Sequence, residues 1–249
     1  MAGHTHSANI ARRKGAVDKK RAKVFSKCAK AIISAVKQGG PDVDGNLKLK
    51  YAVEKAKAAN MPKDNIQRAI KSASGDRGGD MEDLTYEGYA PGGVAVIVVA
   101  LSENRSRTAA DVKHIFDKRG GNLGSPGSVS FMFDFRSIFT IETAGRSEEE
   151  LMELALEVGA VDVEMDGDAA TLLADATEFL AVKSALEEKG VAFLSAETGY
   201  VPQNDVKVAT IEEAKKIVRL LDDLEDHDDV QTVYANYAFE DGWLEQMEG

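Results

Sequence analysis

The chain has 249 residues, of which 43% are hydrophobic and 29% are charged, proportions typical of globular proteins. Its most apolar run, residues 94–101, is far shorter than the ~20 residues of a membrane span. The N-terminus lacks the charged-then-apolar order of a secretory signal. A single cysteine, Cys28, excludes an internal disulfide and fits a reducing compartment. We therefore expect a soluble cytoplasmic protein.

The net charge of −11 is distributed unevenly. Residues 1–75 contain 17 Lys and Arg against 5 Asp and Glu, whereas residues 76–249 contain 14 against 37. Such asymmetry indicates that the basic part meets a polyanion. The acidic remainder should repel nucleic acid and confine contact to one end of the chain. The alternative is a basic domain docked on the acidic ones within the molecule.

The N-terminal part predicts three helices. Apolar residues recur with the helical period from residue 17, and Gly39-Gly40-Pro41 ends this first helix. A second helix is expected over residues 47–59. The third has Pro62 in its first turn, where no N–H is needed, and extends to about residue 73. The linker that follows, residues 74–80, marks the change in charge.

The remainder alternates strands with helices, which indicates sheets covered by helices on one face. Strands are expected at residues 84–89, 94–101, 129–135, 138–142, 161–165, 169–174, 192–200, 206–209 and 230–239. Helices are expected at residues 105–118, 147–158, 177–189 and 211–224.

Asp166-Gly167 is a tight-hairpin dipeptide between two short strands. It suits the centre of a βαββαβ unit, which we place at residues 137–203. The predicted fold is multidomain α+β: an N-terminal three-helix domain followed by two ferredoxin-like (βαββαβ) α/β domains, one nested in the other. The predicted domains are residues 1–75, residues 76–136 with 204–249, and the inserted residues 137–203.

The sequence carries no pattern of catalytic residues. The glycines of residues 120–127 follow a helix and precede a strand, so no helix N-terminus faces a bound phosphate. We interpret them as a turn that needs a permissive backbone. The four histidines are scattered, and the acids form no recognisable acid/base pair. We therefore expect no enzyme activity, no cofactor and no metal.

Lysines on the first helix are the strongest functional feature. Lys20, Lys23, Lys27 and Lys30 lie roughly opposite the apolar side, and Asp18 is the only acid among residues 1–41. We expect them to face solvent and bind phosphates. The candidate nucleic-acid-binding residues are Arg12, Arg13, Lys14, Lys19, Lys20, Lys23, Lys27, Lys30, Lys48, Lys50, Lys63 and Arg68.

Lysine predominates over arginine in this set, and lysine acts as a point charge. Reading of bases is therefore poorly supported, because no recognition helix or aromatic RNA-binding motif is evident. Further along the chain, Asn104-Arg105-Ser106-Arg107 either contacts nucleic acid or caps the helix that follows.

Five blocks of sequence occur in a distinctive order. They are Met1-Ala-Gly-His4 with Ala8-Asn9-Ile10 and Arg13-Lys14-Gly15-Ala16; Asn60-Met-Pro-Lys-Asp-Asn65-Ile66 with Arg68-Ala69-Ile70; Tyr86-Glu-Gly-Tyr89 with Pro91-Gly-Gly-Val-Ala95; Asn104-Arg105-Ser-Arg107-Thr108; and Gly120-Gly-Asn-Leu-Gly124 with Gly127-Ser-Val129. Together they resemble the YebC/PmpR family over nearly the whole chain.

The resemblance implies a helical domain followed by two α/β domains, no enzymatic activity, and a DNA-binding transcriptional regulator of the bacterial cytoplasm. Relatives, including mitochondrial ones, imply an alternative: a ribosome-associated translation factor that binds rRNA and assists synthesis through difficult sequences such as proline runs. A third hypothesis is an interaction scaffold whose acidic domains bind a protein partner. The oligomeric state is left open.

Two departures from the family pattern lie in the presumed binding region. The family usually has tryptophan where this chain has Ser7, which removes a stacking group. It usually has Asn-Pro-Arg-Leu-Arg where this chain has Asn46-Leu47-Lys48-Leu49-Lys50, which keeps charge but loses the guanidinium forks. We expect the target or specificity to differ from typical members.

Overall fold

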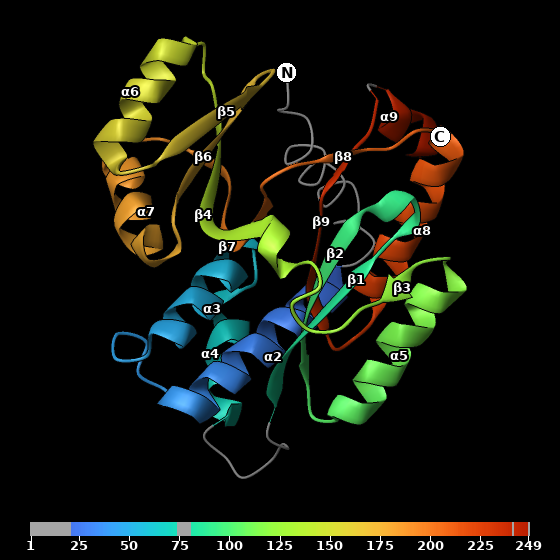
Figure 1. Cartoon of the computed structure of the whole chain (residues 1–249). Coiled ribbons are helices and arrows are strands. Elements are labelled where there is room, and N and C mark those ends of the chain that lie inside the picture. Colours follow the sequence, from blue (N-terminus) through green and yellow to red (C-terminus); the bar gives the residue numbers. More distant parts are fainter. Residues whose placement is uncertain (1–20, 74–80, 241, 249) are drawn as a thin grey trace. The chain divides into compact units, whose positions relative to one another are not determined.

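A computed structural model describes residues 21–73, 81–240 and 242–248 (Figure 1). The chain forms two compact units. The first contains the described residues of Gly15–Ser130 together with Val208–Ala235, and the second contains Phe131–Lys207 and the described residues of Asn236–Gly249. The second unit therefore interrupts the first in the sequence. The predicted division into three domains, with 1–75 separate, stays a prediction.

Three helices open the first unit, as predicted: α2 (Arg21–Gly39), α3 (Leu47–Ala58) and α4 (Lys63–Ala73). Gly40 ends α2 in the left-handed conformation (φ 88°), and its N–H donates to the carbonyl of Val36, as glycine does at helix C-termini. The apolar sides of the three helices meet in one core, which includes Ile32, Leu49 and Ile66. The helical period of the apolar residues predicted this core correctly.

A four-stranded antiparallel sheet completes the first unit, in the order β3-β1-β2-β9. The strands are β1 (Glu82–Tyr89), β2 (Ala95–Ser102), β3 (Asn122–Leu123) and β9 (Val230–Ala235). Helices α5 (Arg105–Lys118) and α8 (Ile211–Asp226) pack on it and against each other. A 3₁₀ turn, η1 (Pro91–Gly93), joins β1 to β2.

The second unit is also a four-stranded antiparallel sheet, in the order β5-β6-β4-β7. After the 3₁₀ turn η2 (Ser130–Met132), its elements in chain order are β4 (Phe133–Glu142), α6 (Glu148–Val158), β5 (Asp162–Asp166), β6 (Ala169–Asp175), η3 (Ala176–Glu178), α7 (Phe179–Glu188) and β7 (Phe193–Pro202). This βαββαβ order and strand adjacency are ferredoxin-like. The central hairpin is present as predicted, but its two-residue turn is Gly167-Asp168 and not Asp166-Gly167, because Asp166 still pairs with Ala169; Gly167 has φ 58°.

The strands of the two sheets are arranged in the same order. Matching β9-β2-β1-β3 to β7-β4-β6-β5 superposes the strand orders, with α5 and α8 in the places of α6 and α7. The difference lies in β1, which precedes β2 in the sequence instead of following β3. The fold is thus α+β with an N-terminal helical region and two ferredoxin-like sheets, one nested in the other, as the sequence predicted.

Several predicted strands need correction. Residues 129–135 and 138–142 do not form two strands; η2 leads into the single strand β4. Residues 206–209 do not join the first sheet, because β1 pairs along its whole length with β2 through a short turn and takes the inner place. Instead β8 (Val206–Lys207) pairs with β10 (Tyr237–Ala238), so the predicted strand 230–239 is divided. The short helix α9 (Trp243–Glu248) was not predicted.

Candidate nucleic-acid interface

Helix α2 is enclosed on two sides within the first unit. One side, including Cys28, Ile32 and Val36, packs into the helical core. The other side bears Lys23, Lys27 and Lys30, one helical turn apart. These three lysines meet the C-terminal end of α8 and the loop that leads into β9.

The end of α8 explains this contact. The last carbonyl groups of a helix have no partners in the helix, and they carry partial negative charge. Helix α8 has no basic residue in its last turn. Lys27 Nζ donates to the carbonyl of Glu225 at 2.7 Å, and Lys23 Nζ donates to the carbonyl of Asp226. Lysines of α2 therefore supply the cations that α8 lacks.

Lys27 is the most enclosed of the three lysines. Burial lowers the pKa of its ammonium group to about 8, against a raising effect from Glu225 and a further lowering effect from Lys23. Desolvation disfavours the charged form of an amine in this way. A lysine that loses its water to the protein interior is poorly placed to bind a phosphate from solution.

Lys30 reaches a buried carboxylate. Its Nζ lies 3.0 Å from the carbonyl of Asp228 and 3.2 Å from Oδ1 of Asp229, whose side chain is only 7% exposed. The other oxygen, Oδ2, accepts a hydrogen bond from Arg107 at 2.7 Å and lies 2.8 Å from the Thr108 hydroxyl. Burial opposes ionisation of Asp229, but hydrogen bonds from Arg107, Thr108 and Lys30 outweigh it and hold its pKa well below the usual range.

Residues 104–107 take the capping role that was one of two predicted for them. Oδ1 of Asn104 accepts the N–H of Arg107 at 3.0 Å and caps α5. The guanidinium of Arg107 is engaged with Asp229.

The prediction that the α2 lysines face solvent is wrong for Lys23, Lys27 and Lys30. Their side chains instead contact the end of α8 and the loop after it. This is the arrangement expected from the alternative, a basic domain docked on the acidic ones within the molecule. The helical period placed them correctly opposite the core, but it could not reveal the second partner. The candidates Arg12, Arg13, Lys14, Lys19 and Lys20 lie outside the described residues.

Two further predicted cations, Lys48 and Lys50 on α3, have acidic neighbours. Lys48 Nζ forms an ion pair with Asp83 and donates to Oε1 of Gln38 at 2.9 Å. Lys50 Nζ lies 3.7 Å from the exposed carboxylate of Asp44. Such exposed pairs are weak, so both lysines can exchange their partners for phosphate.

Helix α4 presents an exposed cationic surface. Lys63 and Arg68, both predicted, are exposed there together with Gln67 and Lys71. We call these four residues the α4 face. Lys63, Gln67 and Lys71 follow one another at intervals of four residues, and side chains at this interval lie along one side of a helix. Gln67 and Lys71 were missed, although their spacing from Lys63 was visible in the sequence.

Backbone N–H groups of the glycine-rich segment after α5 bind a carboxylate of the protein itself. The buried carboxylate of Glu87 accepts three backbone N–H groups, those of Gly127, Val129 and Ser130, each at 2.8 Å. Burial opposes the ionisation of Glu87, but these three hydrogen bonds lower its pKa. Because Glu87 occupies the donors, this loop is a structural turn, as predicted.

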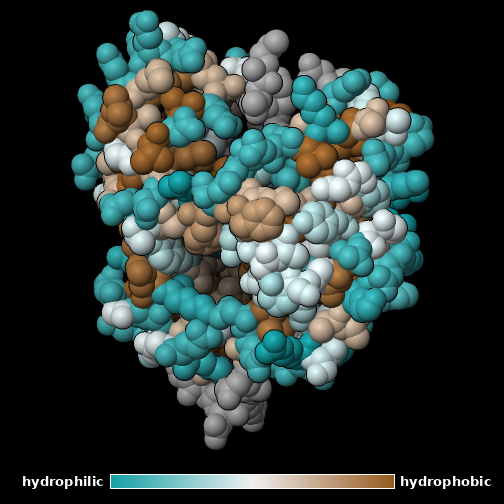
Figure 2. Space-filling model, viewed as in Figure 1, coloured by the Kyte–Doolittle hydropathy of each residue, from teal (hydrophilic) through white to brown (hydrophobic). Residues whose placement is uncertain are grey.

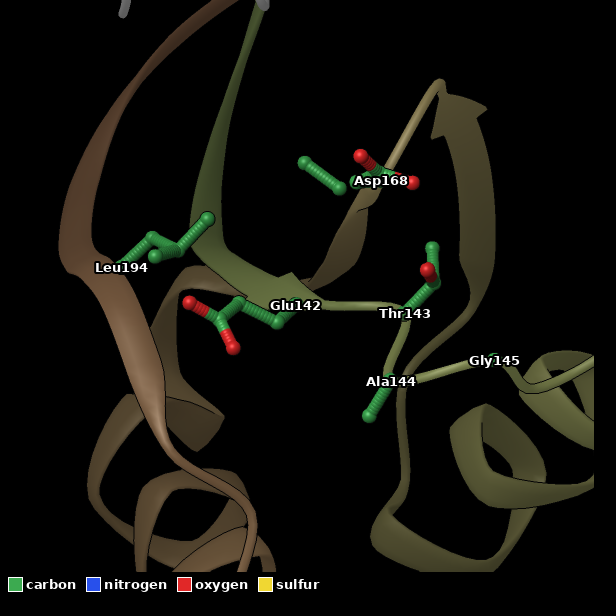
Figure 3. Close-up of a pocket in the computed structure, with 7 residues that line it drawn as sticks. Glu142, Thr143, Ala144, Gly145, Asp168 and Leu194 are labelled. Atoms are coloured by element: carbon green, nitrogen blue, oxygen red, sulfur yellow. The ribbon is translucent and has the colours of Figure 1, made fainter.

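An open hollow of about 510 Å³ lies in the second unit. Its lining is Glu142, Thr143, Ala144, Gly145, Asp168, Ala169 and Leu194. Glu142 and Leu194 extend from neighbouring strands, and Asp168 lies on the hairpin beyond them (Figure 3). Two carboxylates and no cation make this hollow unsuitable for phosphate. Among the residues that the structure describes, no group of three or more metal-ligating side chains could hold a metal ion, and no helix is long and apolar enough to cross a membrane.

Comparisons with known proteins identify the family. Residues 5–76 match the model of the TACO1/YebC protein N-terminal domain, and residues 81–237 match that of the TACO1/YebC second and third domain. A "Probable transcriptional regulatory protein" of Rubrobacter xylanophilus is 47% identical over the full length of both chains. One from Natranaerobius thermophilus is 47% identical, over 98% of this chain and 99% of the relative.

A solved structure supports the same relationship. The crystal structure of a conserved hypothetical protein from Aquifex aeolicus is similar with a TM-score of 0.80 and 44% identity, over 90% of this chain and 93% of that one. Sequence and fold agree along nearly the whole length, so the chain belongs to the TACO1/YebC family.

Proposed function

We propose that the protein is a non-enzymatic regulator of gene expression in the cytoplasm, which binds DNA through the cations of its N-terminal region. Two observations support this proposal. Relatives at 47% identity over 98–100% of the chain are named "Probable transcriptional regulatory protein". Residues 1–75 hold 17 of the 31 basic residues of an otherwise acidic chain, and basic clusters bind phosphate polymers by releasing counterions.

The α4 face is the observation that carries the proposal. It presents Lys63, Arg68 and Lys71 on one exposed side of a helix whose other side is anchored by Ile66 and Ala69 in the core. One acid, Asp64, lies beside them. A row of cations on a helix that is already folded suits phosphate contacts, because little backbone conformational freedom is lost on binding. The proposal includes five further cations because of their charge: Arg12, Arg13, Lys14, Lys19 and Lys20.

The test is DNA binding by the full chain with Lys63, Arg68 and Lys71 all replaced by Gln. Fluorescence anisotropy on labelled duplex DNA over a range of salt should give weaker binding. The slope of log affinity against log salt should flatten by roughly 0.9 for each phosphate that the variant no longer neutralises. The matched control replaces Lys118, Lys215 and Lys216, which are exposed cations of the α/β part, and should bind like the parent. Equal affinities of the two triple variants would contradict the α4 face.

A second candidate is a ribosome-associated translation factor that binds rRNA. The observation in its favour is the scarcity of base-reading groups on the α4 face. Arg68 is held by the carbonyl of Asp64 and by Oδ1 of Asn65, and the lysines are point charges. Contacts of that kind recognise the phosphate backbone and not the sequence.

Crosslinking in cells, followed by sequencing of the recovered DNA and RNA, separates the two candidates. A DNA regulator should enrich particular genomic sites and retain a preference for them over competitor DNA at about 150 mM salt. If rRNA dominates the recovery and the protein co-sediments with ribosomes, the regulated step is translation and not transcription.

A further inference from the structure

Apolar side chains are concentrated on one surface of the second unit. Leu156 is 77% exposed, Val161 67%, Met152 54% and Met165 38%. The described residues include seven exposed large hydrophobic side chains, and these four lie within fourteen consecutive positions on α6, β5 and the turn between them. Scattered exposed apolar residues are ordinary, whereas clustered ones mark interaction sites.

All four residues lie on the same side of the sheet of the second unit. Met152 and Leu156 are one turn apart on α6, beside the buried stripe formed by Leu151, Leu154, Ala155 and Val158. Val161, just before β5, and Val163 and Met165 on it are spaced two residues apart, so their side chains point to the same face of the sheet. Val163 pairs with Leu172, which pairs with Phe139 on the face that α7 covers through Phe179. Because α6 packs on β5, the two pairs lie on the same side of the sheet.

We call Met152, Leu156, Val161 and Met165 the apolar patch. Figure 2 shows apolar surface among hydrophilic surface in the region where Figure 1 places α6 and β5. Binding of a partner that removes such an apolar surface from water is favourable.

The surroundings of the apolar patch are strongly acidic. Residues 142–168 contain ten Asp and Glu and a single basic residue, Arg146. Three of the acids, Glu149, Glu153 and Glu157, follow one another at intervals of four along α6. Glu157 forms an ion pair with Lys189 at 2.5 Å, and Asp162 begins the edge strand. Nucleic acid is repelled by such a surface, and so is the same surface of a second copy.

We propose that the apolar patch is a docking site for a basic amphipathic segment of another protein, one that presents apolar side chains between lysines or arginines. The apolar patch accepts the apolar side chains, and the acidic rim steers the cations and selects against acidic partners. The proposal concerns the second unit and is independent of the α4 face.

The test uses the full chain labelled with ¹³C at its methionine methyl groups. The probe is a synthetic helical peptide of about 18 residues, patterned with Leu on one face and Lys on the other. Its addition should shift the methyl resonances of Met152 and Met165, while the buried Met61 of the helical core stays unchanged. A peptide of equal charge with Gln in place of Leu, and a Leu and Glu peptide, should bind at least about tenfold more weakly.

Substitutions locate the binding. Leu156→Gln combined with Val161→Gln should weaken the Leu and Lys peptide by about tenfold or more. Leu47→Gln, at a 58% exposed position on α3, is the matched control and should leave the affinity unchanged. Equal binding of the parent and the patch variant, or equal binding of the Gln-containing peptide, would overturn the proposal. Self-association of the chain that is abolished by the patch substitutions would also overturn it, because the occupant would then be a second copy.

Discussion

Lys30 and Asp229 form an ion pair with 3.2 Å between Nζ and Oδ1, although 199 positions separate them in the sequence. Asp229 also fixes Arg107 at the start of α5, and its backbone carbonyl accepts the N–H of Leu101 on β2. One residue therefore connects the helical region to a sheet and to the helix that covers it. Within the first unit, the α2 lysines contribute to architecture before any ligand is bound.

Asp229→Asn should destabilise the first unit. The substitution removes the negative charge that Lys30 and Arg107 share, and it places amide hydrogens where two cations donate. Removing the charge of a buried carboxylate whose cationic partners are partly exposed costs about 2–3 kcal/mol in the free energy of unfolding. Urea denaturation at pH 7 measures the loss. Asp228→Asn, at a side chain that is 84% exposed, is the matched control and should cost less than about 1 kcal/mol. Similar losses in the two variants would contradict the central place of Asp229.

Lys27→Met should alter the pH dependence of stability. The pKa of Lys27 is about 8 in the folded protein and about 10.4 in an unfolded chain. Between these values the unfolded state binds more protons, so the stability of the parent rises with pH by up to about 1.4 kcal/mol per pH unit. The Lys27→Met variant lacks this rise. The difference between the two free energies of unfolding, measured in urea at pH 7, 8 and 9.5, should therefore shift in favour of the parent at high pH. A constant difference would show that Lys27 is not desolvated.

Local features of this fold were predictable because they depend on neighbours in the sequence. The apolar period of α2, the bounds of α5 and the hairpin between β5 and β6 were all predicted and are present, although the hairpin turns one residue later than predicted. The surroundings of Lys23, Lys27 and Lys30 were not, because a charged helix side looks the same whether it faces water or another element. A signal did exist: α8 ends in acids, with no basic residue in its last turn to complement its dipole. A helix end of that kind indicates that cations come from elsewhere in the chain.

The candidate site was predictable only in part for a related reason. Lys63 and Arg68 were predicted and are exposed on α4, where no acidic element covers them in the described structure. Charge counting treated them like the α2 lysines, since it does not distinguish a covered side of a helix from an open one. The difference between the two helices is tertiary, and it appears only when the C-terminal end of α8 is placed against α2.

Glu87→Gln should loosen the glycine-rich loop. The carboxylate accepts three N–H groups. In the variant an NH₂ group replaces one of its oxygens, and this group cannot accept a hydrogen bond from the backbone N–H groups that face it. We expect a loss of about 2–3 kcal/mol in the free energy of unfolding and faster amide exchange at Gly127, Val129 and Ser130. Glu82→Gln, at an exposed position on the same strand, should change neither. Unchanged exchange at the three amides would contradict the role of Glu87.

The same substitution has a pH signature. The pKa of Glu87 is lowered in the folded protein, so the stabilisation by its carboxylate is present above the unfolded value of about 4.3 and is lost as the pH falls through the folded value. The parent should therefore lose its advantage over Glu87→Gln in acid. Denaturation curves at pH 7 and below pH 4 measure this convergence, and a gap that persists unchanged in acid would argue against an ionised Glu87.

Asn46→Ala should cost more than Asn104→Ala, although both residues are helix caps. Oδ1 of Asn46 accepts the N–H of Leu49 at 3.1 Å, and its Nδ2 donates to the carbonyls of Ala35 and Gly40, each at 2.8 Å. The buried amide thus joins the end of α2 to the start of α3. At Asn104 the side chain supplies one described hydrogen bond, to the N–H of Arg107.

Loss of an ordinary cap costs about 1 kcal/mol, which we expect for Asn104→Ala. Asn46→Ala also removes the hydrogen bonds from Nδ2 to the carbonyls of Ala35 and Gly40, and we expect about 2–3 kcal/mol. Thermal and urea denaturation of the two variants give the comparison. The larger effect should come with faster amide exchange in both α2 and α3, because the hydrogen bonds of Asn46 span the two helices. Equal losses would mean that water replaces Nδ2 of Asn46, and that the joint between the helices depends on the apolar packing of Leu49 alone.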